Sequence, residues 1–146
     1  MSETNEQELV FNLQCLQRRT ARKRFRKDIL EAWENTCAYC GSDRAHTLDH
    51  VVPRARGGPT KRGNLLACCP TCNLQKSDLD WLLWFRSQSF WTSDREDAIW
   101  HWLSYNHESS IAAREYEEAC REPLKLPARF ENELESALGE ASDDTR

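Results

Sequence analysis

Two Cys-x-x-Cys pairs constrain the fold of this chain more than any other feature of its sequence. The pairs are Cys37-Ala-Tyr-Cys40 and Cys69-Pro-Thr-Cys72. A Cys-x-x-Cys turn directs two thiolates toward one tetrahedral ion, and two such turns complete a closed, structural zinc site. We therefore expect structural Zn²⁺ on all four cysteines; the alternative is four reduced cysteines without a metal.

The remaining cysteines and the termini indicate the cellular compartment. Only Cys69 has the x-x spacing with Cys72, so we expect Cys68 to point into the core, with Cys15 and Cys120 as small apolar residues. An odd total of seven cysteines fits metal thiolates in a reducing compartment better than disulfides. No apolar stretch approaches the roughly 18 residues of a membrane span, and the N-terminus lacks a signal-peptide pattern. We expect a soluble, intracellular, cytoplasmic protein without a membrane partner.

Charge divides the chain into two unlike halves. Residues 1–76 carry 13 Lys and Arg against 8 Asp and Glu, a balance of +5, whereas residues 77–146 carry 7 against 16, a balance of −9. Seven basic residues gather within residues 18–27. Such a cluster indicates a polyanionic partner such as nucleic acid, although a solvated helix face can carry the same charges without a ligand.

Glycine placement separates irregular from helical segments, since four of the five glycines lie within residues 41–63. In this window, residues 45–52 and 64–67 read as two strands of a hairpin with a long loop. Pro70 suits the first turn of a helix that runs through Lys76. One or two amphipathic helices are expected upstream and two downstream, the second beginning at Ser93; helical spacing places Trp81 and Trp84 in the core.

Polar residues between the two cysteine pairs have the chemistry of a catalytic metal site. Asp49 and His50 are adjacent, so a strand would project them to opposite sides, and a chain exit at Pro53 could bring both toward one cleft. Asn73 follows a zinc ligand directly, where its amide oxygen could coordinate a hard cation. Asn64 precedes the returning strand. Each residue alone would be read as a cap, a turn or a surface side chain, but the combination indicates a functional site.

At these residues the sequence resembles the HNH endonucleases. The resemblance covers residues 37–76, through Cys37-x-x-Cys40, Leu48-Asp49-His50-Val51-Val52-Pro53, Gly57-Gly58, Asn64-Leu65-Leu66, Cys69-x-x-Cys72-Asn73 and Lys76. His50 falls on the first family histidine and Asn64 on the middle asparagine. Asn73 stands where the name-giving motif has histidine, a replacement common in the Asp-His branch of the family.

The resemblance implies an α+β fold with a small ββα-metal, treble-clef-like core, a four-cysteine structural zinc, and α-helices on both flanks. On this basis we divide the chain into four parts. These are a basic helical extension at residues 1–35, an HNH nuclease core at 36–90, a Trp-rich helical extension at 91–130 and an acidic tail at 131–146.

The resemblance also implies metal-dependent hydrolysis of DNA phosphodiester bonds that leaves 5′-phosphate and 3′-hydroxyl ends. His50 would be the general base, since an imidazole with a pKa of about 6.5 is available in its neutral form at pH 7. Asp49 and Asn73 would hold one divalent ion, Mg²⁺ or Mn²⁺, because their oxygens suit hard cations. Asn64 would fix the loop and orient His50.

We expect double-stranded DNA as the partner, and composition leaves a homodimer open. Basic residues should contact phosphates that flank the cut. The residues we expect to do so are Arg22, Arg26, Arg54, Arg56, Lys61, Arg62 and Lys76. Two other functions remain open: a non-catalytic, zinc-stabilised nucleic-acid-binding module, and a zinc-stabilised protein-interaction domain that uses its Trp-rich helices.

Overall fold

The computed structural model of the chain describes residues 3–128, and the acidic tail predicted at residues 131–146 lies outside them. The described elements, in chain order, are α1 (Glu3–Ala32), β1 (Thr47–His50), η1 (Arg54–Arg56), η2 (Arg62–Asn64), β2 (Leu65–Cys68), α2 (Pro70–Lys76), α3 (Trp81–Arg86), α4 (Ser93–Ser104), η3 (His107–Ser109) and α5 (Ile111–Arg121). This mixture of helices with one two-stranded sheet confirms the α+β class.

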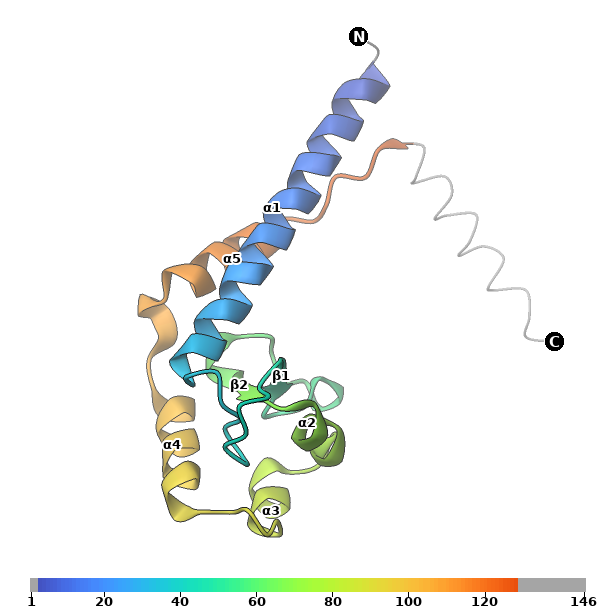
Figure 1. Cartoon of the computed structure of the whole chain (residues 1–146). Helices are drawn as coiled ribbons and strands as arrows, with labels where there is room; N and C mark the ends of the chain where they lie inside the picture. Colours follow the sequence, from blue (N-terminus) through green and yellow to red (C-terminus); the bar gives the residue numbers. More distant parts are fainter. Residues whose placement is uncertain (1–2, 129–146) are drawn as a thin grey trace, which may run out of the picture.

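The long helix α1 organises the molecule (Figure 1). The sheet and α2 lie at its C-terminal end, α3 and α4 continue from them, and α5 returns to lie alongside the middle of α1. The stacked rings of Phe25 in α1 and Tyr116 in α5, with centroids 4.6 Å apart, join the two helices. No helix in the described part of the chain is both long and apolar enough to cross a membrane.

The two strands pair antiparallel, from Thr47 opposite Cys68 to His50 opposite Leu65. Each strand has four residues, so β1 is shorter than the predicted segment 45–52. It ends at His50 because the backbone of Val52 hydrogen-bonds to the side chain of Asn64 instead of continuing the ladder. All four residues of β2 are buried.

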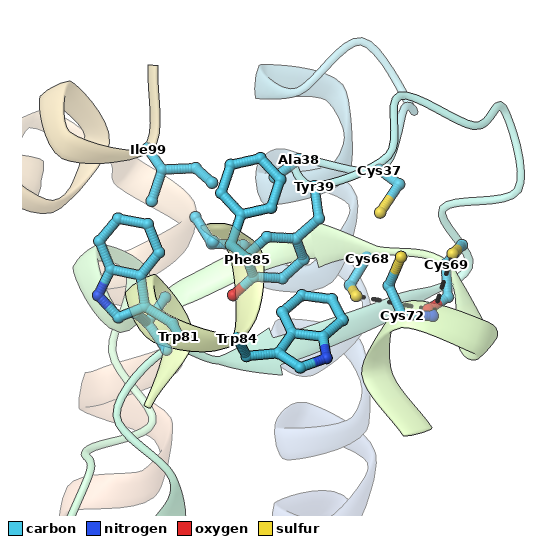
Figure 2. Packing of buried hydrophobic residues seen from close by; sticks show 12 residues of the cluster. Cys37, Ala38, Tyr39, Cys68, Cys69, Cys72, Trp81, Trp84, Phe85 and Ile99 are labelled. Atoms are coloured by element: carbon cyan, nitrogen blue, oxygen red, sulfur yellow. Dashed lines mark hydrogen bonds between the residues drawn. The ribbon is translucent and has the colours of Figure 1, made fainter. Parts of the chain in front are cut away.

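An aromatic cluster packs against the sheet and the cysteines (Figure 2). Tyr39 meets Trp84 and Phe85 edge to face, with ring centroids 5.0 and 5.4 Å apart. Trp81 and Ile99 complete the same cluster. Trp81 and Trp84 are therefore core residues, as their helical spacing predicts.

Helix starts follow the local capping chemistry. Helix α2 begins at Pro70, as predicted, and the thiol of the N-cap residue Cys69 accepts from the backbone N–H of Cys72. Helix α4 begins at Ser93, but its N-cap is Thr92, whose hydroxyl accepts from the Arg95 N–H. The helix therefore begins where the sequence predicts, and the preceding residue supplies its cap.

The four predicted zinc ligands converge. The sulfur atoms of Cys37, Cys40, Cys69 and Cys72 all lie within 4.8 Å of one another, and the Cys40 and Cys69 sulfurs are 3.8 Å apart. An ion about 2.3 Å from each of four tetrahedral sulfurs places them about 3.8 Å apart, so the cluster has the dimensions of a zinc site. Cys68 is buried in the core beside it.

The protonation chemistry of the cluster suits a cation. A hydrogen bond with the Cys68 thiol lowers the pKa of Cys37 to about 4, which favours the thiolate that binds metals. Burial raises the pKa of Cys40 and Cys72. A bound cation would offset that cost of ionisation, because coordination deprotonates a thiol outright.

Lys76 fixes α2 on the sheet. Its side chain is fully buried, and its Nζ donates to Asp49 Oδ1 at 3.1 Å and to the backbone oxygen of His50 at 3.0 Å. The prediction that Lys76 contacts phosphates is therefore wrong, because its ammonium group faces inward, where Asp49 neutralises it. Lys76 instead holds the end of β1 against the last turn of α2.

Zinc removal should unfold the core. We expect Cys37→Ser to lose the metal and to lower the thermal midpoint by about 10 °C or more, because structural zinc supplies folding free energy directly. The matched control is Cys120→Ser, since Cys120 is an exposed free cysteine. Metal analysis should find one zinc ion per wild-type chain; a metal-free protein with unchanged thermal stability would exclude the zinc site.

The buried ion pair predicts a large effect for Lys76→Met. Removing one partner of such a pair leaves the other charge uncompensated, at a cost of about 3–5 kcal/mol. Urea unfolding should show this loss, whereas Lys61→Met, which changes an exposed lysine, should stay within about 0.5 kcal/mol of the wild type. Equal stability of the two variants would contradict the assigned role of Lys76.

Candidate active site

His50, the last residue of β1, opens into a cleft of about 340 Å³. Its walls come from α1, the two strands, the loop after β1, and α5. The lining side chains are Arg22, Phe25, Arg26, Leu48, His50, Arg54, Thr60, Leu65 and Tyr116. Three arginines thus line the same cleft as His50, so the cleft suits an anionic substrate.

The loop that follows β1 brings Thr60 to His50. The η1 turn ends at Gly57, which has a left-handed φ of 82°. Gly58 passes so close to Val52 that an added Cβ would lie 1.7 Å from the Val52 carbonyl oxygen. This tight return places Thr60 Oγ1 2.9 Å from His50 Nε2. The hydroxyl thus orients the imidazole from the solvent side.

Asn64 ties the two ends of this loop together. Its Oδ1 accepts from the Val52 N–H at 2.9 Å, and its Nδ2 donates to the carbonyl oxygens of Val52 and Pro59 at 3.1 and 2.9 Å. The side chain is 8% exposed, and all of its polar atoms have partners inside the protein. These contacts hold the loop after β1 in a fixed shape beside His50.

Asp49 points away from His50, into the core. Its Oδ2 accepts from the Tyr39 hydroxyl at 2.7 Å and its Oδ1 from Lys76 Nζ at 3.1 Å. Asp49 is not among the residues that line the His50 cleft, so the chain exit at Pro53 does not bring the two side chains into it. Burial raises the pKa of the Asp49 carboxyl, and the charge of Lys76 opposes that shift.

Asn73 lies on α2 beside the start of β1. Its Nδ2 donates to Thr47 Oγ1 at 3.1 Å and to the Leu48 carbonyl oxygen at 3.2 Å. These two bonds fix the orientation of the amide. Its Oδ1 accepts no hydrogen bond from the described residues, which leaves that oxygen free for a ligand.

The environment of His50 favours its neutral form. Burial lowers the pKa of the imidazole, and the charges of Arg54 and Lys76 lower it further. A neutral imidazole can accept a proton at pH 7. The electrostatics of the cleft therefore suit a general base.

The predicted phosphate contacts fall into different environments. Arg54, Arg56 and Lys61 are exposed around the loop. Arg62 is instead held inside the protein: its Nε donates to Asp28 Oδ2 at 2.8 Å and its guanidinium lies 4.5 Å from the centre of the Trp102 ring. Arg62 thus joins the loop to α1 and α4, and its prediction as a phosphate contact is wrong.

Sequence reasoning missed several residues around the site. Tyr39, which holds Asp49, stands inside the first Cys-x-x-Cys pair, where an aromatic residue could have drawn attention. Thr60 lies in the predicted loop without any distinguishing pattern. Tyr116 reaches the cleft from α5, 66 positions after His50, and no local signal connects the two.

Comparisons with known proteins give the family of the core. The family model of the HNH endonucleases matches residues 37–79. The CRISPR-associated endonuclease Cas9 of Actinomyces naeslundii is 44% identical over 63 residues, which cover 40% of this chain and 6% of that protein. The corresponding Cas9 of Corynebacterium diphtheriae is 36% identical over 75 residues, covering 47% of this chain and 7% of that protein.

The chain thus spans well under a tenth of the length of the curated relatives it matches. No significant match was found among solved structures. The matched segment contains both cysteine pairs, both strands, α2 and the Asp49-His50 pair. Residues 37–79 of this chain therefore form a domain of the HNH endonuclease family.

Proposed function

We propose that the protein is an endonuclease that hydrolyses DNA phosphodiester bonds with His50 as the general base. One observation carries the proposal: His50, at the family's motif position, opens into a cleft that also contains Arg22, Arg26 and Arg54. A neutral base beside cationic side chains suits the in-line attack of water on a phosphodiester.

In this proposal His50 accepts the proton of the attacking water, and the Thr60 hydroxyl and the Asn64-fixed loop hold the imidazole in place. Arginines of the cleft bind non-bridging phosphate oxygens and reduce the repulsion between the phosphodiester and the nucleophile. The bond to the 3′ oxygen breaks as the bond from water to phosphorus forms. The products carry 5′-phosphate and 3′-hydroxyl ends.

A divalent ion, Mg²⁺ or Mn²⁺, is part of the proposal, with Asp49 and Asn73 as its ligands. The ligand types suit a hard cation: Asn73 offers an amide oxygen, Oδ1, that accepts no hydrogen bond from the described residues, and Asp49 offers a carboxylate. Because both Asp49 oxygens bind Tyr39 and Lys76 in the core, the carboxylate would have to turn toward the cleft to hold the ion. Such an ion would supply charge stabilisation for the leaving oxygen when bound.

Double-stranded DNA is the proposed substrate, and the cell interior, where thiols stay reduced, is the proposed setting. One such site attacks one phosphodiester, so cutting both strands requires two events or two copies. A homodimer would supply the second site. The N-terminal half of α1 exposes apolar residues that a second copy could cover, among them Leu9, Leu13 and Leu16.

A plasmid-nicking assay tests the proposal. Zinc-loaded wild-type protein should relax supercoiled DNA in Mg²⁺ or Mn²⁺, and His50→Ala should lower the rate by about 10²–10⁴-fold, the usual contribution of a general base. His101→Ala is the matched control, because His101 is an exposed histidine on α4 away from the cleft.

Two results would contradict the endonuclease. If the protein cuts no form of DNA with either ion, a nucleic-acid-binding module or a protein-interaction domain would explain the chain better. Equal rates for His50→Ala and His101→Ala would show that the hydrolysis arises elsewhere.

The lowered pKa of His50 predicts the acid limb of the pH–rate profile. The base must be neutral, so kcat/KM should fall as the pH drops through the pKa of His50, with a midpoint below 6.5. Arg54→Gln removes a neighbouring positive charge and should move the midpoint upward. A wild-type midpoint above 6.5, or an unmoved one in Arg54→Gln, would contradict the assignment.

A further inference from the structure

The basic cluster of α1 divides into two sets that the sequence does not distinguish. In the first set, each side chain is bound either to α5 or to a carboxylate of the protein. Arg18 Nε donates to the Ala119 carbonyl oxygen at 3.1 Å, Arg24 lies 3.5 Å from Glu115, and Lys27 lies 3.7 Å from Glu31. These three cations therefore stabilise α1 and its packing on α5.

The second set consists of Arg19, Arg22, Lys23 and Arg26. Within residues 3–128, Arg19, Arg22 and Lys23 have no hydrogen bond or ion pair, and all three are exposed. Arg26 donates only to the backbone oxygen of His46. No carboxylate of the described chain neutralises any of these four charges.

Helix geometry places the four residues on one face, in the i, i+3, i+4, i+7 spacing. Successive residues of an α-helix are about 100° apart, which puts the centre of this face roughly 150° from the face that carries Arg18, Ala21 and Arg24. The latter face borders α5. We call the former the free stripe; α5 reaches it through Tyr116, which lines the cleft with Arg22 and Arg26.

The free stripe starts at the candidate active site. Arg22 and Arg26 line the His50 cleft, Lys23 lies between them in sequence, and Arg19 continues the same face toward the N-terminus of α1. In Figure 1, α1 extends from the sheet well past the rest of the core in this direction. Like charges at i, i+4 destabilise a helix, so the unneutralised stripe has a cost that an anionic ligand would remove.

We propose that the free stripe, and not the basic cluster as a whole, binds the phosphate backbone of the DNA on one side of the scissile bond. This inference rests on the proposed function for the position of the cut. Seven residues of helix span about 10 Å, which corresponds to about three nucleotides of one strand at 3.4 Å each. Arg19 and Lys23 are thus substrate-binding residues outside the family domain.

The two sets provide a charge-matched experiment. Arg19→Gln with Lys23→Gln removes two charges of the free stripe, whereas Arg24→Gln with Lys27→Gln removes two paired charges from the same helix. Both double variants are made in the zinc-loaded His50→Ala protein, and binding is measured without Mg²⁺ or Mn²⁺ so that the duplex stays intact. Binding to a fluorescent DNA duplex of about 30 base pairs is measured by anisotropy over a salt series.

The variant with Arg19→Gln and Lys23→Gln should bind the duplex at least about tenfold more weakly than its parent at 0.1 M salt. The slope of the logarithm of its binding constant against the logarithm of the salt concentration should be smaller by about 1.8. The variant with Arg24→Gln and Lys27→Gln should keep the slope of the parent protein. Circular dichroism should show that both doubles stay folded, and Arg19→Lys with Lys23→Arg should retain wild-type binding.

Equal losses in the two doubles would overturn the proposal, because they would show a dependence on net charge alone. An unchanged slope in the stripe double would overturn it as well, and so would a His50→Ala protein that binds no duplex. If binding depends on the free stripe but the wild-type protein cuts no DNA, the stripe proposal would hold and only the nuclease proposal would fail.

Discussion

The contact between the Tyr39 hydroxyl and Asp49 connects the two halves of the core. Tyr39 lies between two cysteines of the four-thiolate cluster, and Asp49 lies on β1 next to His50. A sheet of two four-residue strands is marginally stable by itself, so its position depends on what it is tied to. The cysteine cluster fixes the sheet on one side, through the contact between Tyr39 and Asp49, and Lys76 fixes it on the other side. Loss of a metal bound by the cysteines would therefore disturb the His50 end of β1 as well as the fold.

The family domain provides only part of the candidate active site. Residues 37–79 carry His50, Arg54 and Thr60, but Arg22, Phe25 and Tyr116 come from helices on either side of that segment. The stacking of Phe25 on Tyr116 joins the two flanks, so the first and last described helices close the cleft together. Both flanks therefore belong to the functional unit, and the isolated 37–79 segment would lack two walls of its own cleft.

Sequence reasoning gave the fold class, the hairpin, the start of α2 and the four converging cysteines, because each depends on local spacing or on a fixed coordination number. It failed where long-range packing decides. Lys76 is a basic residue of the family pattern, yet its ammonium group is buried and forms an ion pair with Asp49. Arg62 belongs to the same basic loop as Lys61, yet Asp28 and Trp102 hold it. The residues that determine these outcomes lie 27, 34 and 40 positions away, and periodicity carries no information about such pairs.

In the proposed complex, α1 carries the free stripe from the His50 cleft toward the N-terminus of the helix, and this direction bears on turnover. Arg22 and Arg26 line the cleft, Lys23 lies between them in sequence, and Arg19 continues the stripe beyond Arg22. An enzyme that binds its polymer on one side of the broken bond holds the two product ends with unequal affinity. The weakly bound end would dissociate first, and the tightly bound end would dissociate slowly at low salt. Product release, rather than bond cleavage, would then limit repeated cutting.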